Sequence, residues 1–262
     1  MIIDSHEHVI CPPEKQLQLM DEAGIDHTIL FSTTVHPEKF RDFRGMSDEV
    51  NRLYTMMKGS ISSSASRVKA AEELASAVAF CPSRYHGFGP IPLGLPAEEC
   101  QSWIKTYILP HHFIGMGELL PPPGHAEILE PIFQASGQCG NLPIWIHTFD
   151  PLTWEDIQVI LRLAARFPQI PVILGHLGGM HWMDMLKNVR SLPNVYLDLS
   201  ALFTTMALVY AVREYPDRTF FSSDAPYGRP LSCLTVLRQN IQDPAVFQKV
   251  TGGNIARVLS LS

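Results

Sequence analysis

The chain has 262 residues, of which 46% are hydrophobic and 18% are charged, a balance that is ordinary for a soluble enzyme. Its formal net charge of -6 offers no basic surface for phosphate groups, which argues against binding to nucleic acid or to an anionic membrane. The five cysteines are scattered and form no Cys-x-x-Cys pair, and no secretion signal or long apolar run is visible. We therefore expect a reduced, cytoplasmic protein without a membrane span.

Short apolar segments alternate with amphipathic segments along the whole chain. Several apolar segments, such as residues 172–174, are hydrophobic without alternation, which is typical of parallel strands buried on both faces. Eight strands are predicted in this way, at residues 2–9, 28–32, 87–91, 113–119, 143–148, 172–176, 195–199 and 219–223.

The intervening segments have helical signals at their ends. An amphipathic segment over residues 14–23 ends at a glycine, and another over residues 155–167 follows the capping-box pair Thr153 and Asp156. Eight strands that alternate with helices predict a closed (β/α)₈ barrel, or TIM barrel, as one domain over residues 1–262. An open doubly wound sheet is the alternative, but the first strand–helix turn lacks a glycine-rich phosphate loop.

One low-complexity stretch interrupts this pattern. Residues 60–66 are rich in serine and lie within the long connection over residues 47–79. We interpret the stretch as a mobile surface loop, and a lid over the active site is the alternative interpretation.

The most informative motif is His6-x-His8 in the first predicted strand. Side chains two residues apart on a strand point to the same side, so we expect both imidazoles to face the barrel axis. A buried histidine pair needs hydrogen-bond partners or a metal ion. Other strands end in metal-binding residue types at the end of the barrel where active sites form, and these predict one metal site together with the two histidines. They are Glu118, His147, His176 and Asp224.

These residues and their surroundings resemble the amidohydrolase superfamily, in particular its amidohydrolase-related branch, over essentially the whole chain. The resemblance implies the barrel fold, a bound divalent metal and an aspartate, here Asp224, that handles protons. Many relatives have a carbamylated lysine or a glutamate at the end of strand four, and this chain has Glu118. The matching segments are His6-x-His8, His147, Gly175-His176-Leu177-Gly178-Gly179, Ser223-Asp224-Ala225-Pro226 and Gly253-Asn254-Ile255-Ala256-Arg257.

The resemblance and the donor atoms lead us to expect a metal-dependent hydrolase. A metal-activated water would cleave the C–O or C–N bond of a lactone, ester or amide, and Asp224 would be catalytic by passing the proton of that water to the leaving group. Nitrogen and oxygen donors suit two zinc ions, with manganese, iron or cobalt as substitutes. Glu118 would bridge the two ions, with His6, His8 and Asp224 holding the first and His147 and His176 the second.

Three alternatives stay open. The first is a non-oxidative decarboxylase of the same superfamily, which would hold one metal and would not need Glu118. The second is a catalytically silent metal-binding protein. The third is a phosphoesterase acting on nucleic acid, which the acidic charge disfavours.

Substrate contacts are expected from the loops that follow the strands. We expect a small organic substrate, and the exposed helices of a barrel would permit a homodimer. Arg229 could pair with a substrate carboxylate, although a surface salt bridge is its more ordinary role. The candidates for substrate binding are His36, Phe149, His181, Trp182, Phe203, Tyr227 and Arg229.

Overall fold

The computed structural model describes residues 1–58 and 63–261. Its centre is an eight-stranded sheet in which every strand pairs in parallel with the next strand along the chain. The strands are β1 (Ile3–His8), β2 (His27–Phe31), β3 (Tyr85–Gly89), β4 (Gly115–Leu119), β5 (Ile144–His147), β6 (Val172–Gly175), β7 (Val195–Asp198) and β8 (Thr219–Phe220).

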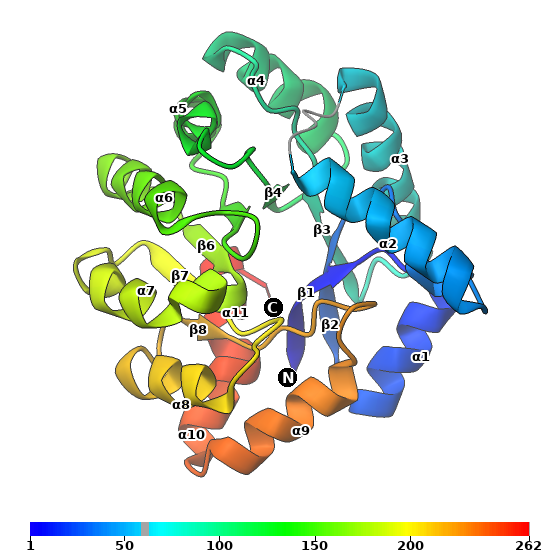
Figure 1. The fold of residues 1–262 in the computed structure, drawn as a ribbon, viewed down its shortest axis with the longest axis vertical. Coiled ribbons are helices and arrows are strands. Elements are labelled where there is room, and N and C mark those ends of the chain that lie inside the picture. Colours follow the sequence, from blue (N-terminus) through cyan, green and yellow to red (C-terminus); the bar gives the residue numbers. More distant parts are fainter. Residues whose placement is uncertain (59–62, 262) are drawn as a thin grey trace.

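The chain segment that follows β8 returns to β1 and closes the barrel. The backbone N–H of Ser5 donates to the carbonyl of Phe221 at 3.1 Å, and the N–H of His8 donates to the carbonyl of Ala225 at 2.7 Å. These bonds continue the sheet beyond the two residues of β8, which is shorter than the predicted strand over residues 219–223. The predicted (β/α)₈ barrel is confirmed, and Figure 1 shows the helices around the strands.

Helices follow the strands and cover the outside of the barrel. The predicted ends of two helices are confirmed: α1 stops at Gly24, whose φ of 71° is left-handed, and the capping box of Thr153 and Asp156 opens α6. The helices are α1 (Pro13–Ala23), α2 (Phe43–Met57), α3 (Ser64–Phe80), α4 (Ala97–Trp103), α5 (Glu130–Gln138), α6 (Trp154–Arg166), α7 (Trp182–Asn188), α8 (Thr205–Glu214), α9 (Pro230–Asn240), α10 (Pro244–Gln248) and α11 (Asn254–Leu259).

The third strand lies two residues earlier than predicted. It covers Tyr85–Gly89 instead of residues 87–91. Pro90 and Pro92 follow it, and a proline has no N–H to donate to a sheet, so the pairing ends at Gly89.

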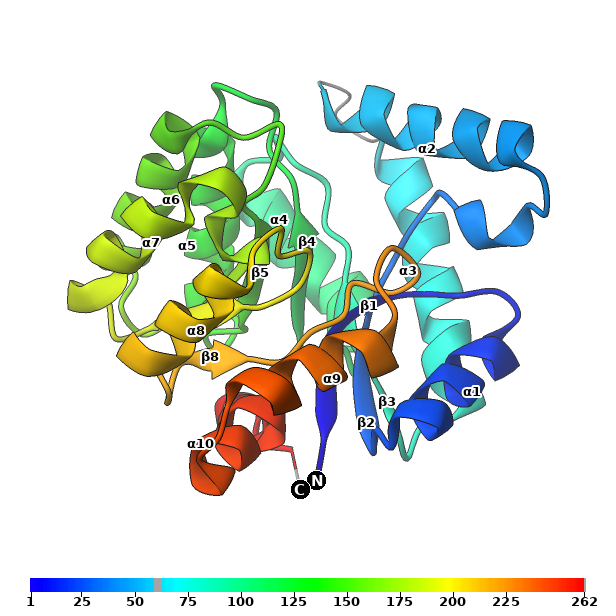
Figure 2. The same ribbon diagram turned by 60° about the horizontal axis from the view of Figure 1, so that its bottom comes forward.

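The long connection over residues 47–79, which contains the stretch predicted as a surface loop, is mostly helical. Ser63 caps α3, because its hydroxyl accepts the backbone N–H of Ser66 at 3.3 Å. The loop prediction is therefore wrong for residues 64–66, which form the first turn of α3, while residues 60–62 lie outside the described residues. Figure 2 shows α2 at the end of the molecule opposite the two termini, so the α2–α3 pair rises beside the mouth of the barrel.

Apolar side chains fill the inside of the barrel at the end where the strands begin. Helix α11 and the turn before it close the end where the strands begin, since Ile255 joins the interior cluster and Gly252, in that turn, lies against the backbone of Met1. At the other end, where the strands finish, the interior side chains are polar and form the site described below. The apolar interior cluster consists of Ile3, Ile29, Phe31, Phe88, Trp145, Ile173, Phe220 and Ile255.

Among the residues that the structure describes, no helix combines the length and the apolar character needed to cross a membrane.

Candidate metal centre

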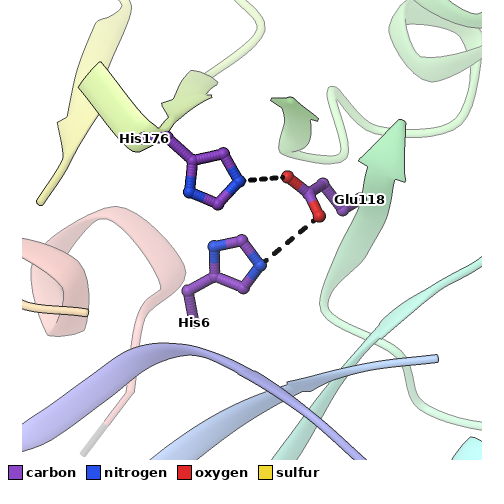
Figure 3. Close-up of side chains that lie close together, drawn as sticks. All are labelled: His6, Glu118 and His176. Atoms are coloured by element: carbon purple, nitrogen blue, oxygen red, sulfur yellow. Dashed lines mark hydrogen bonds and ion pairs between the residues drawn. The ribbon is translucent and has the colours of Figure 1, made fainter. Parts of the chain in front are cut away.

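All six predicted metal ligands meet at the carboxyl ends of the strands. Glu118, near the end of β4, lies among the four histidines, as Figure 3 shows for His6 and His176. Its Oε1 atom is 3.0 Å from Nδ1 of His147 and 3.0 Å from Nε2 of His176. Its Oε2 atom is 3.6 Å from Nε2 of His6 and 3.8 Å from Nε2 of His8. One carboxylate therefore contacts histidines from strands β1, β5 and the end of β6.

Asp224 approaches the same cluster from the segment after β8. Its Oδ1 atom is 3.3 Å from Nε2 of His8 and 3.8 Å from Nε2 of His6. Its backbone has a left-handed φ of 59°, and its N–H donates to the carbonyl of His6 at 2.8 Å. Few residues other than glycine adopt this conformation, and those that do are concentrated at functional sites. The turn places the carboxylate directly beside the two histidines of β1.

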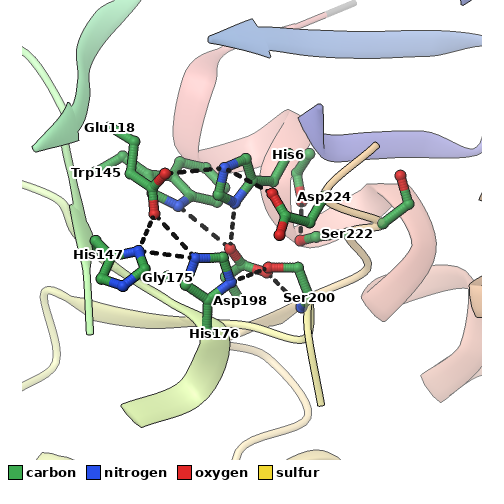
Figure 4. A network of polar contacts seen from close by, with 12 residues as sticks. His6, Glu118, Trp145, His147, Gly175, His176, Asp198, Ser200, Ser222 and Asp224 are labelled. Atoms are coloured by element: carbon green, nitrogen blue, oxygen red, sulfur yellow. Dashed lines mark hydrogen bonds and ion pairs between the residues drawn. The ribbon is translucent and has the colours of Figure 1, made fainter. Parts of the chain in front are cut away.

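The second nitrogen of three histidine rings has its own partner in the protein, and Figure 4 shows this for His6 with Asp198 and for His176 with Ser200. Metal-binding histidines commonly donate their outer N–H in this way, which fixes the tautomer and leaves a lone pair on the nitrogen that faces the ion. The three pairs are His6 Nδ1 with Asp198 Oδ2 at 2.7 Å, His176 Nδ1 with Ser200 Oγ at 2.8 Å, and His147 Nε2 with the carbonyl of Asp150 at 3.0 Å.

Asp198 is a site residue that sequence reasoning missed. It ends β7 and is fully buried, and its Oδ2 atom also accepts the indole N–H of Trp145 at 3.3 Å. Burial alone would raise the pKa of this carboxyl, but His6 lowers it to about 2. The signal was an aspartate inside an otherwise apolar strand, because a buried carboxylate requires a partner.

The charges in the cluster stabilise one another. Burial alone would raise the pKa of the Glu118 carboxyl, but His6, His147 and His176 hold it well below its usual range. Burial alone would lower the pKa of His176, and the Glu118 carboxylate raises it above the ordinary value. Without an ion, an anionic Glu118 would therefore lie against protonated imidazole.

The donor set fits a divalent metal ion. Nε2 of His6 and Oδ1 of Asp224 are buried and have no hydrogen-bond partner among the described residues. Unpaired buried nitrogen and oxygen atoms are costly, and a cation held between them would satisfy both. Two overlapping groups have ligand atoms within 4.8 Å of one another: His6, His8 and Asp224, and His6, Glu118 and His176.

A cavity of about 560 Å³ opens beside the cluster, and two of the predicted substrate residues line it. Phe149 stands 6.3 Å from the ring of His176, and Tyr227 lies 5.8 Å from the ring of His8. The remaining wall is mainly apolar and comes largely from the α2–α3 pair. It includes Val35, Leu53, Met56, Met57, Ala70 and Leu120.

Arg67 of α3 adds a cation to this wall. Its Nε atom is buried and has no hydrogen-bond partner within the part of the chain that the structure describes. Burial lowers the pKa of its guanidinium. A guanidinium of this kind is suited to binding a carboxylate. Sequence reasoning missed Arg67, which directly follows the stretch over residues 60–66 that was interpreted as a surface loop.

The other predicted substrate residues lie outside the cavity, so we do not include them in the site. Arg229 forms a surface ion pair, the more ordinary of the two roles that the sequence analysis gave it, and Phe203 is exposed. All of these residues except Phe203 have partners in the protein. These partners are Glu22 for Arg229, Trp154 for His181, Tyr210 for Trp182, and Glu38 and Glu73 for His36.

The sequence matches the amidohydrolase family over residues 3–261. The chain belongs to this family. No curated protein matches the chain by sequence.

Several solved structures share the fold. The 5-carboxyvanillate decarboxylase LigW from Sphingomonas paucimobilis is 17% identical, with a TM-score of 0.70 over 100% of this chain and 99% of that one. The 2,6-dihydroxybenzoate decarboxylase from Rhizobium is 19% identical, with a TM-score of 0.65 over 99% of this chain and 98% of that one. A dihydroxybenzoic acid decarboxylase from Polaromonas sp. JS666, with bound manganese and the inhibitor 2-nitroresorcinol, is 19% identical, with a TM-score of 0.64 over 99% and 97% of the two chains.

At these identities the likeness establishes the fold. All three of these structures are named as decarboxylases, whereas the sequence analysis favoured a hydrolase for this chain. The family and the relative with bound manganese support a divalent metal, whereas our choice of zinc rested on the donor atoms alone.

Proposed function

We propose that this amidohydrolase-family chain is a metal-dependent enzyme that removes CO₂ from a small organic acid without oxidation. The observation behind the proposal is a division within the cluster. The ligand atoms of His6, His8 and Asp224 lie within 4.8 Å of one another, while Oε1 of Glu118 contacts His147 and His176 at 3.0 Å. The decarboxylases among its structural relatives support the same reaction.

His6, His8 and Asp224 would hold the ion, since their ligand atoms lie within 4.8 Å of one another. A divalent ion bound there would act as a Lewis acid toward an oxygen of the substrate. Asp198 fixes the ring of His6 through its Nδ1 atom at 2.7 Å, so the Nε2 lone pair faces the ion position.

His176 is positioned to supply the proton that the reaction requires. Loss of CO₂ breaks a C–C bond and leaves its electron pair on carbon, so R–COO⁻ and one H⁺ become R–H and CO₂. His176 lines the cavity, and the Glu118 carboxylate raises its pKa despite burial, which favours the protonated ring. Ser200 fixes the orientation of that ring through Nδ1 at 2.8 Å.

The cavity suits a substrate with an apolar body and anionic groups. Its volume of about 560 Å³ is in the range usual for small-molecule sites. The apolar wall from α2 and α3 would contact the body of the substrate, and Arg67 would pair with a carboxylate or another anionic group.

Hydrolysis is the second candidate, and the position of Glu118 favours it. Its two carboxylate oxygens face different histidines, Oε1 toward His147 and His176 and Oε2 toward His6 and His8. This is the arrangement that a carboxylate bridging two ions requires. Asp224 would then accept the proton of the attacking water, as the sequence analysis expected.

A labelled-substrate assay separates the two reactions. The metal-loaded protein is incubated with small aromatic and aliphatic acids that carry ¹³C in the carboxyl group, and in parallel with lactones, esters and amides. We expect labelled CO₂ from at least one acid, and its loss after treatment with a chelator. Metal-dependent hydrolysis without release of labelled CO₂ would refute the decarboxylase and put the second candidate first.

The His176→Gln variant tests the proton donor. Glutamine keeps a polar side chain but cannot donate a proton as an acid, so CO₂ release should fall at least about 100-fold. The metal bound by His6, His8 and Asp224 should be retained, as measured by metal content. Turnover close to that of the wild type would exclude His176 as the donor.

A further inference from the structure

A second cluster of metal-binding side chains lies at the edge of the barrel, outside the cavity. Cys11 follows β1, His36 follows β2, and Glu73 lies on α3. One ligand atom from each of these three residues lies within 4.8 Å of the others. None of the three is among the described residues that line the cavity, so the cluster is separate from the candidate metal centre.

The distances in this cluster are close to those of a tetrahedral zinc site. Oε1 of Glu73 is 2.9 Å from Nε2 of His36 and 3.7 Å from Sγ of Cys11. Zinc bonds of about 2.0–2.3 Å at tetrahedral angles place neighbouring ligand atoms roughly 3.3–3.7 Å apart. Small side-chain movements would therefore bring all three atoms into contact with one ion.

Glu38 contacts the ring nitrogen of His36 that does not face Glu73. Its Oε1 atom is 3.1 Å from Nδ1 of His36 and accepts the backbone N–H of Cys11 at 3.2 Å. Its Oε2 atom is buried without a hydrogen-bond partner in the described part of the chain. A carboxylate that binds the outer N–H of a histidine fixes the tautomer that binds metal. The same relation holds between Asp198 and His6 in the candidate metal centre.

We propose that Cys11, His36 and Glu73 form a second divalent-metal site, best suited to zinc, with a water molecule as the fourth ligand. Without the ion, a proton on His36 Nε2 holds the ring to Glu73. Binding displaces that proton and the thiol proton of Cys11 to solvent, and the Nδ1 proton stays between His36 and Glu38.

The ion would link α3, through Glu73, to the loops that follow β1 and β2, through Cys11 and His36. Arg67 lies six residues before Glu73 on the same helix, which is about 9 Å along its axis. The site would therefore hold in place the helix that presents the Arg67 guanidinium to the cavity.

Cobalt provides a selective test, because the candidate metal centre offers only nitrogen and oxygen donors. Thiolate coordination gives Co²⁺ an intense charge-transfer absorption in the near ultraviolet, which nitrogen and oxygen ligands do not give. We expect this absorption on titrating Co²⁺ into the wild-type protein. It should be absent in Cys11→Ser and retained in Cys139→Ser, the matched control at another half-buried thiol. No absorption in the wild type, or its persistence in Cys11→Ser, would overturn the proposal.

A second variant and a stability measurement keep the test independent of how Cys11→Ser folds. Glu73→Gln keeps the thiol and removes the carboxylate ligand, so its cobalt affinity at the absorbing site should fall at least tenfold. Zinc at about 100 times its Kd for the wild type should raise the Tm of the wild type by roughly 3 °C more than that of Glu73→Gln. Equal cobalt affinity and an equal Tm rise in both proteins would contradict the site. The absorption and the Tm rise do not depend on turnover, so they test this site separately from the proposed reaction.

Discussion

Replacing Asp198 with asparagine tests how the candidate metal centre is held. Three N–H groups converge on this carboxylate: Nδ1 of His6 at 2.7 Å, Nε1 of Trp145 at 3.3 Å and the backbone N–H of Ser200 at 2.6 Å. The first two donate to Oδ2 and the third to Oδ1. An asparagine amide has one acceptor oxygen and one NH₂ group, so in either orientation the NH₂ group faces at least one of these donors.

The expected magnitude follows from that count. A hydrogen bond to a charged group contributes about 1.5–3 kcal/mol, which is about a 10- to 150-fold change in an equilibrium constant. Loss of the carboxylate behind a metal-binding histidine commonly lowers metal affinity 10- to 100-fold. We therefore expect Asp198→Asn to bind the metal of the candidate centre 10- to 100-fold more weakly.

The affinity is measured by competition with a chelator of known affinity, in a Cys11→Ser background so that only the candidate centre is titrated. Asp184→Asn is the matched control, because Asp184 is half-exposed and pairs with Lys187 at the surface. Near-unchanged affinity in Asp198→Asn, with a folded protein, would refute the orienting role of Asp198.

Three further predictions concern the cavity, the core and a helix end. Arg67→Met should raise the KM for an acidic substrate about tenfold or more with a smaller change in kcat, and an unchanged KM would remove Arg67 from the site. Ile173→Ala should lower the free energy of unfolding in urea by about 2–5 kcal/mol, since Ile173 is fully buried inside the barrel; a loss below about 1 kcal/mol would contradict that packing. Thr153→Ala should cost about 0.5–2 kcal/mol in the same experiment through loss of the α6 cap, and no loss would show that the cap contributes nothing.

The barrel and its metal ligands could be predicted because their signals are local. Continuous apolar segments indicate buried parallel strands, and residues such as His147 and Asp224 stand at or just beyond the strand ends, where the topology of a barrel brings them together. The capping box at Thr153 is likewise contained within four residues. Each of these features depends on the chain immediately around it.

The supporting groups could not be predicted in the same way. Asp198 is 192 positions from His6, and no local pattern joins the two residues. Arg67 was missed because no helix was predicted after the serine-rich stretch over residues 60–66, although serine also favours the helix cap found at Ser63. His36 was predicted to contact substrate, but its partners, Glu38 and Glu73, become visible only when α3 packs against the barrel.

The central claim is that one ion lies between His6, His8 and Asp224, while Glu118 stays paired with His147 and His176. Anomalous X-ray diffraction from crystals of the metal-loaded protein, at the absorption edge of the bound metal, locates every ion directly. The account predicts a peak at the first position and none between Glu118, His147 and His176. A second peak at Glu118 would contradict it in favour of a two-metal hydrolase, and no peak beside His6, His8 and Asp224 would contradict the metal centre itself.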